Sequence, residues 1–218
     1  MRFLVYSLLI GAMALGCLAC DEKKEKVDEK PFAMELEDPV IPPAAFTSFV
    51  NGFQRGMEPQ LYDGKWLLDF FNENKVREIS PKVCEEFIHN QEVWHHVANG
   101  GKQEKIRLSA DKPYYYIGQF ADTGSYITLM FSDLEEEATE TYLTTYTKDG
   151  KFISGIVIQA AFRDSPQASE LSYERTCRIV PKHTPTLIIT DAQAGKGSAT
   201  KVYEITLDGI IQPNQRAS

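Results

Sequence analysis

Two adjacent histidines, His95 and His96, are the residues whose type and position could do chemistry, because histidine serves as a metal ligand and as a base near neutral pH. Neighbouring side chains diverge on a helix and point to opposite faces of a strand, so the pair does not readily ligate one ion. Glu92 and His95 would share a helix face, but no His-Glu-x-x-His metalloprotease motif is present. We therefore expect histidines at a surface or subdomain edge, and we predict no metal site, no cofactor and no catalytic residue.

Other short motifs fall short of the pattern that their chemistry requires. The stretch Ala194 to Ser198 resembles a phosphate loop, but it lacks the required glycine ahead of Gly195-Lys196, so a hairpin loop is the better interpretation. Ser125 and Ser154 have no Gly-x-Ser-x-Gly context, which disfavours a serine hydrolase. The acidic run Asp133 to Glu137 lacks calcium-loop spacing, so we expect a solvated loop between two strands.

Three consecutive tyrosines, Tyr114 to Tyr116, could line a binding surface. In an alternating strand, however, two of the three simply share one face. We expect them to pack in the core or at its edge.

The first thirty residues carry the most informative pattern in the chain. Arg2 is followed by an apolar segment, by Gly16-Cys17-Leu18-Ala19-Cys20, and then by a charged run that begins at Asp21. The apolar segment is short for a membrane span, and the arrangement is that of a secretory signal.

This arrangement resembles the signal of a bacterial lipoprotein. The resemblance implies cleavage after residue 19, acylation of Cys20 and attachment to a membrane through the N-terminal acyl chains. Cys17, which also follows a small residue, is the second choice for lipidation. An ordinary secretory signal and an uncleaved anchor helix are the remaining alternatives. The expected location is the bacterial cell envelope, and both the periplasmic face and the cell surface stay open.

Residues 20–43 are predicted to form a charged tether, because they are rich in acidic and basic residues and poor in side chains that could pack. The whole chain carries a formal charge of -8, which argues against broad nucleic-acid binding. Beyond the signal, Cys84 and Cys177 are the remaining cysteines. In an exported protein they are candidates for a disulfide, and the alternative is two buried free thiols that act as small apolar side chains.

Residues 44–98 are predicted to form a small helical subregion. Phe46, Phe49, Val50 and Phe53 follow helical spacing. A second apolar face begins after Asp63-Gly64 with Trp66, Leu67, Phe70 and Phe71, and a third helix is expected at Ser80-Pro81, where Ser80 is the cap and proline takes the first helical position.

Residues 99–218 are predicted to form an antiparallel β domain, because short β-prone runs alternate with turn residues. The expected strands are 105–109, 114–120, 126–131, 141–147, 152–162, 172–180, 187–190, 201–207 and 210–212. Asp149-Gly150 is typical of a two-residue type I′ turn, which would place Tyr146 opposite Ile153, Tyr142 opposite Val157 and Leu143 opposite Ile156. Asp208-Gly209 repeats this turn pattern near the end of the chain.

The predicted fold class is α+β, a small N-terminal helical subregion followed by an antiparallel β-meander that can curl towards a barrel. The leading hypothesis is a membrane-anchored envelope lipoprotein with a non-catalytic binding or assembly role, whose partner is an unknown envelope protein or small ligand. The alternative is an envelope hydrolase in which His95 or His183 acts as a base with partners distant in sequence. A pocket that holds either histidine beside a carboxylate or hydroxyl would favour this alternative.

Overall fold

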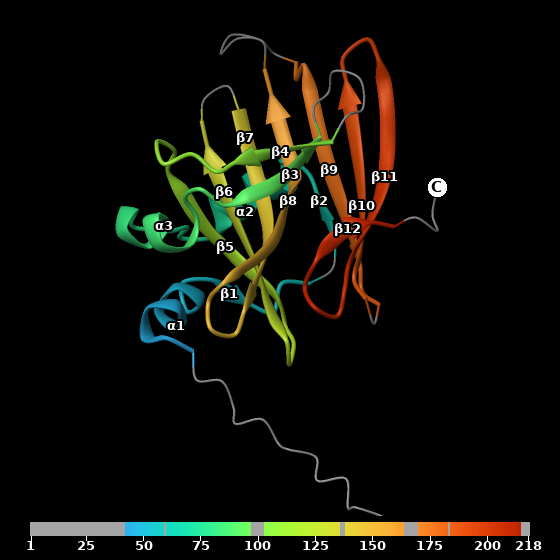
Figure 1. Cartoon of the computed structure of the whole chain (residues 1–218). Helices are drawn as coiled ribbons and strands as arrows, with labels where there is room; N and C mark the ends of the chain where they lie inside the picture. The colour runs from blue at the N-terminus through green and yellow to red at the C-terminus, as the bar shows by residue number, and fades with distance from the viewer. Residues whose placement is uncertain are drawn as a thin grey trace, which may run out of the picture. The chain divides into compact units, whose positions relative to one another are not determined.

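The fold was analysed in a computed structural model, which describes residues 42–58, 60–96, 103–135, 138–163, 170–182 and 184–214. These residues belong to one compact unit, built mostly from a 12-stranded sheet with three short helices (Figure 1). The α+β class predicted from the sequence is confirmed. Across these ranges, none of the helices has the length and apolar character that a membrane span requires.

The helices lie in the N-terminal part of the described chain and are α1 (Ala44–Val50), α2 (Gly64–Glu73) and α3 (Pro81–Phe87). The strands are β1 (Gln54–Arg55), β2 (Leu61–Tyr62), β3 (Glu92–His96), β4 (Gln103–Arg107), β5 (Tyr114–Asp122), β6 (Tyr126–Leu134), β7 (Ala138–Thr147), β8 (Phe152–Phe162), β9 (Tyr173–Val180), β10 (Thr186–Gln193), β11 (Gly197–Ile205) and β12 (Ile211–Pro213). The range that was predicted to be helical therefore also contributes three short strands.

The three helices begin where the sequence predicts them. The Asp63 carboxylate accepts a hydrogen bond from the backbone N–H of Trp66 at 2.7 Å and caps α2. Pro81 occupies the first turn of α3, but the Ser80 hydroxyl makes no capping hydrogen bond. The position of proline therefore starts this helix without the predicted side-chain cap.

Strands β5 to β12 form an antiparallel meander in chain order. Two parallel pairs add segments from the N-terminal part, because β1 pairs with β5 and β3 pairs with β8. The β3–β4 hairpin joins β8 through one register pair, Trp94 with Ile156. Along the described strands, the path of the sheet runs from β1 to β12 without closing into a barrel.

The β7–β8 hairpin has the predicted register through most of its length, with Tyr142 opposite Val157 and Leu143 opposite Ile156. Near the turn an irregularity places Tyr146 opposite Phe152, which corrects the predicted pairing with Ile153. Only the glycine of Asp149-Gly150 has a positive φ, 88°, and its N–H donates to the carbonyl of Thr147 at 3.0 Å. The turn therefore resembles a type I turn followed by a left-handed glycine rather than a type I′ turn.

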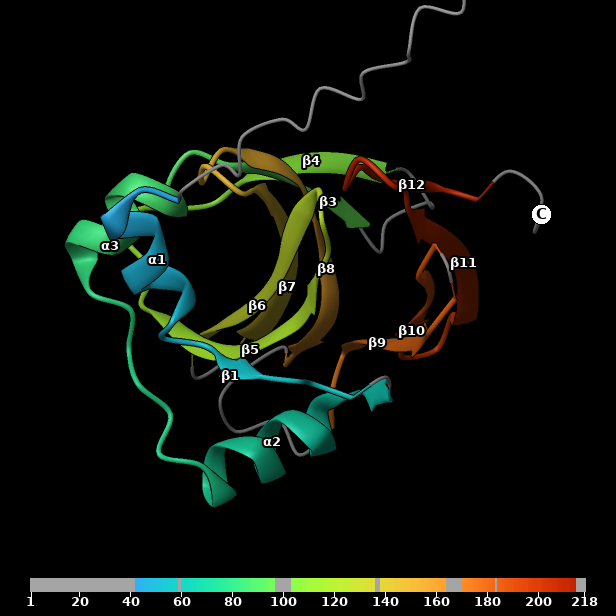
Figure 2. The same cartoon turned by 90° about the horizontal axis from the view of Figure 1, so that it is seen from below.

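Two core clusters lie against the curved sheet, and Figure 2 shows α1 and α3 together at one side, with β9 to β12 at the other. The first cluster packs α1 and α3 against β5 to β8, and its aromatic centre includes Phe49 stacked on Phe87 at 5.0 Å between ring centroids. The second cluster packs β5 to β8 against α2 and β9 to β12. Within β9 and β10, Arg175 Nε donates to the Asp191 carboxylate at 2.7 Å in a buried ion pair.

Cys84 and Cys177 are free thiols, both buried, and they belong to different core clusters. The candidate disulfide between them is therefore not formed in this structure, and the alternative of two buried apolar thiols describes them. Burial raises the pKa of Cys84 to about 11 and raises that of Cys177 as well, so both stay protonated near neutral pH.

Candidate functional site

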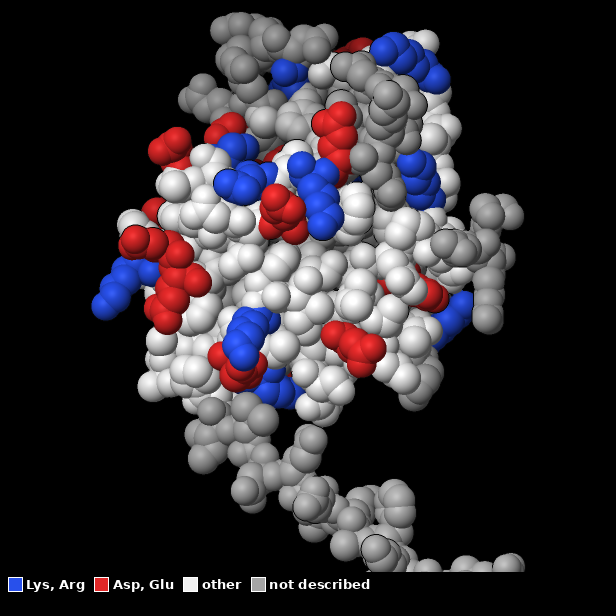
Figure 3. Space-filling model, in the orientation of Figure 1, with Lys and Arg blue, Asp and Glu red and all other residues white. Residues whose placement is uncertain are grey.

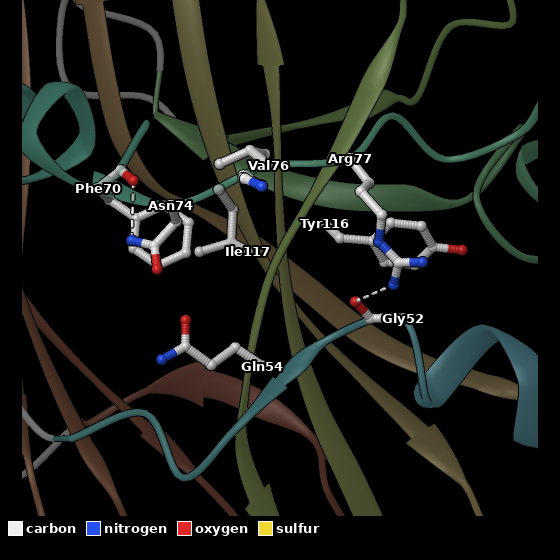
Figure 4. A pocket seen from close by; sticks show the side chains of 9 residues that line it. Gly52, Gln54, Phe70, Asn74, Val76, Arg77, Tyr116 and Ile117 are labelled. Atoms are coloured by element: carbon white, nitrogen blue, oxygen red, sulfur yellow. Dashed lines mark hydrogen bonds between the residues drawn. The ribbon is translucent and has the colours of Figure 1, made fainter. Parts of the chain in front are cut away.

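A pocket of about 160 Å³ lies where α2 ends, between the residues around β1 and the middle of β5 (Figure 4). Phe70, Val76 and Ile117 supply an apolar part of its wall. The polar lining consists of the side chains of Gln54, Asn74, Lys75 and Arg77, together with the Tyr116 ring and the backbone of Gly52. The pocket thus combines a small apolar surface with convergent polar groups, which is the usual character of a ligand site.

The guanidinium of Arg77 is held in place at this pocket. Its Nη2 donates to the carbonyl oxygen of Gly52 at 3.3 Å, and its Cζ lies 5.6 Å from the centroid of the Tyr116 ring. Figure 4 shows the guanidinium over that ring with its hydrogen bond directed to Gly52. A guanidinium has five N–H donors. This arrangement therefore leaves donors available to a ligand while it restricts the motion of the side chain.

The contact between Gly52 and Tyr116 explains the glycine. A Cβ atom at position 52 would lie 2.3 Å from a carbon of the Tyr116 ring, which is far inside van der Waals contact. Burial raises the pKa of the Tyr116 hydroxyl, and the nearby Arg77 charge partly offsets this effect. The ring is therefore neutral at physiological pH and forms a fixed platform for the guanidinium.

Two carboxamides form the other polar side of the pocket. The Asn74 Nδ2 donates to the carbonyl of Phe70 at 2.9 Å, and the Asn74 N–H donates to the same carbonyl at 3.0 Å, so this residue caps the end of α2. Gln54 lies opposite Gly118 in the parallel β1–β5 pair. In Figure 4 the carboxamide ends of Gln54 and Asn74 face each other, and Arg77 lies at a distance from both.

The charge of the pocket is opposite to that of the chain. Lys75 and Arg77 are its charged lining residues, whereas the chain has 31 acidic and 23 basic residues. Figure 3 shows blue and red side chains intermingled on the face that it draws, without a large area of one sign. The local excess of positive charge is therefore a property of this pocket.

A second group of polar residues is buried at the opposite end of the β6–β7 hairpin from the pocket side chains and centres on Asp133, which has no exposed surface. Its Oδ1 accepts the backbone N–H of Glu140 at 2.8 Å, and its Oδ2 accepts hydrogen bonds from Lys112 Nζ and from the Tyr142 hydroxyl, both at 2.9 Å. Both carboxylate oxygens thus have donors. Asp133, Glu140, Tyr142, Lys112 and His95 are called the carboxylate network below.

Glu140 connects this network to β3. The Tyr142 hydroxyl lies 2.6 Å from Oε2 of Glu140, and His95 Nε2 lies 2.9 Å from Oε1. The side chains of His95 and Glu140 are 13% and 8% exposed, so the contact is largely removed from water. His95 Nδ1 is buried and has no hydrogen-bond partner among the described residues.

The two carboxyl groups have pKa values shifted in opposite directions. Burial raises the pKa of Asp133, and Glu140 adds to the increase although Lys112 opposes it. Burial alone would also raise the pKa of Glu140, but hydrogen bonds from His95 and Tyr142 outweigh burial and lower it. Because the Tyr142 hydroxyl has one proton for two carboxyl groups, a protonated Asp133 can donate to Tyr142 while Tyr142 donates to an ionised Glu140.

The network could relay a proton, but its bonding favours a structural role. Each described carboxylate oxygen already has a donor, so a substrate would have to displace an existing hydrogen bond. Within the described ranges, no group of three or more His, Cys, Asp or Glu residues has an arrangement that could hold a metal ion.

The structure places the sequence-predicted residues in several regions. His95 and His96 lie on β3, so the residues around them form a strand and not the helix face that would join His95 to Glu92. The side chain of His96, all of His183, and both Cys17 and Cys20 lie outside what the structure describes. His95 is therefore the one candidate base that can be placed, and it is brought together with Glu140.

Two other motifs have clear outcomes. The stretch Ala194 to Ser198 forms the turn and first residues of the β10–β11 hairpin, as predicted, with positive φ at Gly195 and Gly197. The predicted solvated loop at the acidic run is wrong for Asp133, which lies in β6 and is fully buried. Asp133 continues the alternation of Ile127, Leu129 and Phe131 along the strand, and Lys112 and Tyr142 compensate for its burial.

The tyrosine run behaves as expected for a strand and also contributes to the pocket. Tyr114 is fully buried in the first core cluster, and Tyr116 packs against the same cluster while it lines the pocket. Arg77, Lys112, Glu140 and Tyr142 were not identified from the sequence, because their partners are distant along the chain. The pair Glu140 and Tyr142, two residues apart on one strand face, was the one local indication.

Comparison with known proteins gave no match to any family model, to any curated protein or to any solved structure.

Proposed function

We propose that this chain is a lipid-anchored protein of the bacterial cell envelope whose folded domain binds a small ligand without catalysis. The observation that supports binding is the pocket, where a fixed guanidinium, two carboxamides and an apolar wall converge. The anchor is supported by the residues around Cys20, which resemble a lipoprotein signal. The tether would present the pocket to ligands at a distance from the membrane.

The anchor is tested by metabolic labelling with a radioactive fatty acid. The intact chain should incorporate label, and Cys20→Ala should abolish incorporation, whereas Cys17→Ala should leave it unchanged. The reverse pattern would move the anchor to Cys17, and labelling of neither protein would refute acylation.

The binding role is tested by a fragment screen on the full chain in detergent, with thermal stabilisation as the readout. The screen uses neutral, cationic and anionic fragments against the wild type and Gln54→Trp, in which an exposed lining residue is enlarged to fill the pocket. Ser48→Trp, on the exposed side of α1, is the matched control. Fragments should stabilise the wild type and the control but not Gln54→Trp. Equal stabilisation of all three, or of none, would contradict binding at this pocket.

A second candidate function, an envelope hydrolase, is favoured by one observation. His95 lies beside the Glu140 carboxylate, and the Tyr142 hydroxyl contacts the same carboxylate. A base of this kind would be oriented by its carboxylate partner. Turnover of ester, amide or glycoside substrates by the purified chain, lost in His95→Gln, would establish this candidate and refute the non-catalytic proposal.

A further inference from the structure

We propose that the pocket at Arg77 binds a small organic carboxylate that carries an amide or similar hydrogen-bonding group a few atoms from the acid, as the C-terminal residue of a peptide does. This inference rests on the binding function proposed above and specifies its ligand class. The guanidinium of Arg77 would bind the carboxylate, and the carboxamides of Gln54 and Asn74 would bind the second polar group.

The volume of the pocket limits the ligand. At about 160 Å³ it is well below the roughly 300 Å³ at which sites for drug-sized ligands begin. A ligand of single-residue size fits this space, as does the end of a longer chain whose remainder stays in solvent. The apolar wall of Phe70 and Ile117 would contact a small aliphatic side chain.

The charge and geometry of Arg77 favour an acid. Its guanidinium is always protonated and presents parallel N–H donors that match the two oxygens of a carboxylate. The hydrogen bond to Gly52 and the contact with the Tyr116 ring already restrict this side chain, so less conformational entropy is lost on binding. No carboxylate lines the pocket to compete with the ligand, and Lys75 adds a second positive charge.

The end of α2 distinguishes a carboxylate from a phosphate. Phosphate sites are commonly built from the N-terminus of a helix, where free N–H groups and the positive end of the dipole converge. This pocket instead contacts Phe70 and Asn74 at the C-terminal end of α2, where the dipole is negative. A dianion is therefore disfavoured, and a single carboxylate that lies at Arg77, away from this helix end, is preferred.

The facing carboxamides supply the second point of recognition. An amide side chain offers both a donor and an acceptor, so Gln54 and Asn74 together can bind the N–H and the C=O of a ligand amide. One N–H of Asn74 is used in capping α2, and its side-chain oxygen stays on the pocket side in Figure 4. The site is thus suited to an acylated amino acid more than to a simple fatty acid.

The test is calorimetric titration of the full chain in detergent with four compounds: N-acetylalanine, its neutral methylamide, free alanine and inorganic phosphate. N-acetylalanine should bind, and the methylamide should bind at least about tenfold more weakly because it lacks the charge. Free alanine should bind more weakly than N-acetylalanine, since it lacks the amide. Stronger binding of free alanine would assign the site to free amino acids and overturn the peptide-end proposal.

Arg77→Gln should weaken binding of N-acetylalanine by about tenfold or more, because an Arg–carboxylate contact is replaced by a neutral one. Arg55→Gln is the matched control, since Arg55 is exposed on β1 and bonds to Asn51 outside the pocket lining. Asn74→Ala should also weaken binding of N-acetylalanine while leaving the affinity for acetate unchanged.

Each contrary result has a distinct meaning. Equal binding of the acid and its methylamide, both lost in Gln54→Trp, would overturn the carboxylate assignment and leave the pocket as the binding site. Preferred binding of phosphate would overturn the argument from the helix end. Failure of all four compounds, when the fragment screen has found other ligands for the pocket, would refute this ligand class but not the proposed function.

Discussion

The pocket at Arg77 and the carboxylate network both lie along β5, yet their polar groups are satisfied in different ways. In the network, Asp133 is fully buried and both of its oxygens accept hydrogen bonds from the protein. In the pocket, exposed Arg77 makes one hydrogen bond of 3.3 Å and rests on a ring. Polar groups that are saturated by the protein hold strands together, whereas groups with unused donors are able to bind a ligand.

This contrast separates stability from binding by residue. Changes in the network should destabilise the fold, and changes in the pocket should affect binding with little effect on stability. The following predictions test that separation.

Removal of the central carboxylate should have the largest effect. Asp133→Ala leaves the Lys112 ammonium, the Tyr142 hydroxyl and the Glu140 N–H without their acceptor, so we expect a loss of about 3–5 kcal/mol in the free energy of unfolding. Urea unfolding followed by circular dichroism measures this loss. Glu92→Ala is the control, because its contact with Arg107 is exposed and is expected to contribute less than about 1 kcal/mol. Equal losses in the two variants would show that the network does not hold the fold.

Loss of His95 should have a smaller and more local effect. His95→Ala leaves Oε1 of Glu140 without the histidine donor, at an expected cost of about 1–3 kcal/mol. Because the β3–β4 hairpin joins β8 through one register pair, amide exchange should accelerate in β3 and β4 and remain slow in β7. His89→Ala is the control, since that ring contacts Tyr114 without a carboxylate partner in the described chain. Uniform acceleration across the whole sheet would contradict a local clasp.

The sequence was informative where structure depends on local contacts. The alternation and turn residues of β5 to β12 predicted each strand, and the β8 bounds 152–162 agree at both ends. The fold class follows from the same pattern, because consecutive strands with short connections pair antiparallel. Departures occur where a tertiary contact intervenes, as at Tyr146, whose hydroxyl donates to the carbonyl of Phe87 in α3 at 2.9 Å.

Neither site could be read from the sequence, because each is assembled from distant segments. His95 and Glu140 are 45 residues apart, and Arg77 meets Gly52 across 25 residues. Composition also pointed the wrong way for Asp133, since an acidic run is usually solvated. The decisive feature was a lysine 21 residues earlier, Lys112, whose contact with Asp133 depends on the β5–β6 pairing.

The acid stability of the protein should depend on Glu140. Its pKa is lowered from the ordinary value of 4.5, so its contribution to stability is present above that value and is lost as the pH falls through the lowered pKa of the folded state. Asp133 has a raised pKa and acts in the opposite direction: its contribution is present at low pH and is lost as the pH rises through its folded-state pKa. The stability difference between wild type and Glu140→Gln should therefore shrink on acidification.

Urea midpoints of the wild type and Glu140→Gln, measured above pH 4.5 and again below it, test this sign. Asp133→Asn is the informative comparison, because removal of the opposing group should make the acid loss steeper than in the wild type. A difference between wild type and Glu140→Gln that grows on acidification would show that Glu140 is not stabilised in its ionised form.

The smallest effect on stability is expected at the pocket. Arg77→Gln removes an exposed guanidinium whose contacts are one long hydrogen bond and the Tyr116 ring, which together should contribute at most about 1 kcal/mol. Arg175→Gln is the matched comparison: that arginine is 1% exposed and pairs with Asp191, so its loss should cost about 3–5 kcal/mol. Urea unfolding of the two variants side by side measures the difference. If Arg77→Gln were as destabilising as Arg175→Gln, Arg77 would be a structural residue, and its loss would weaken binding by disturbing the fold.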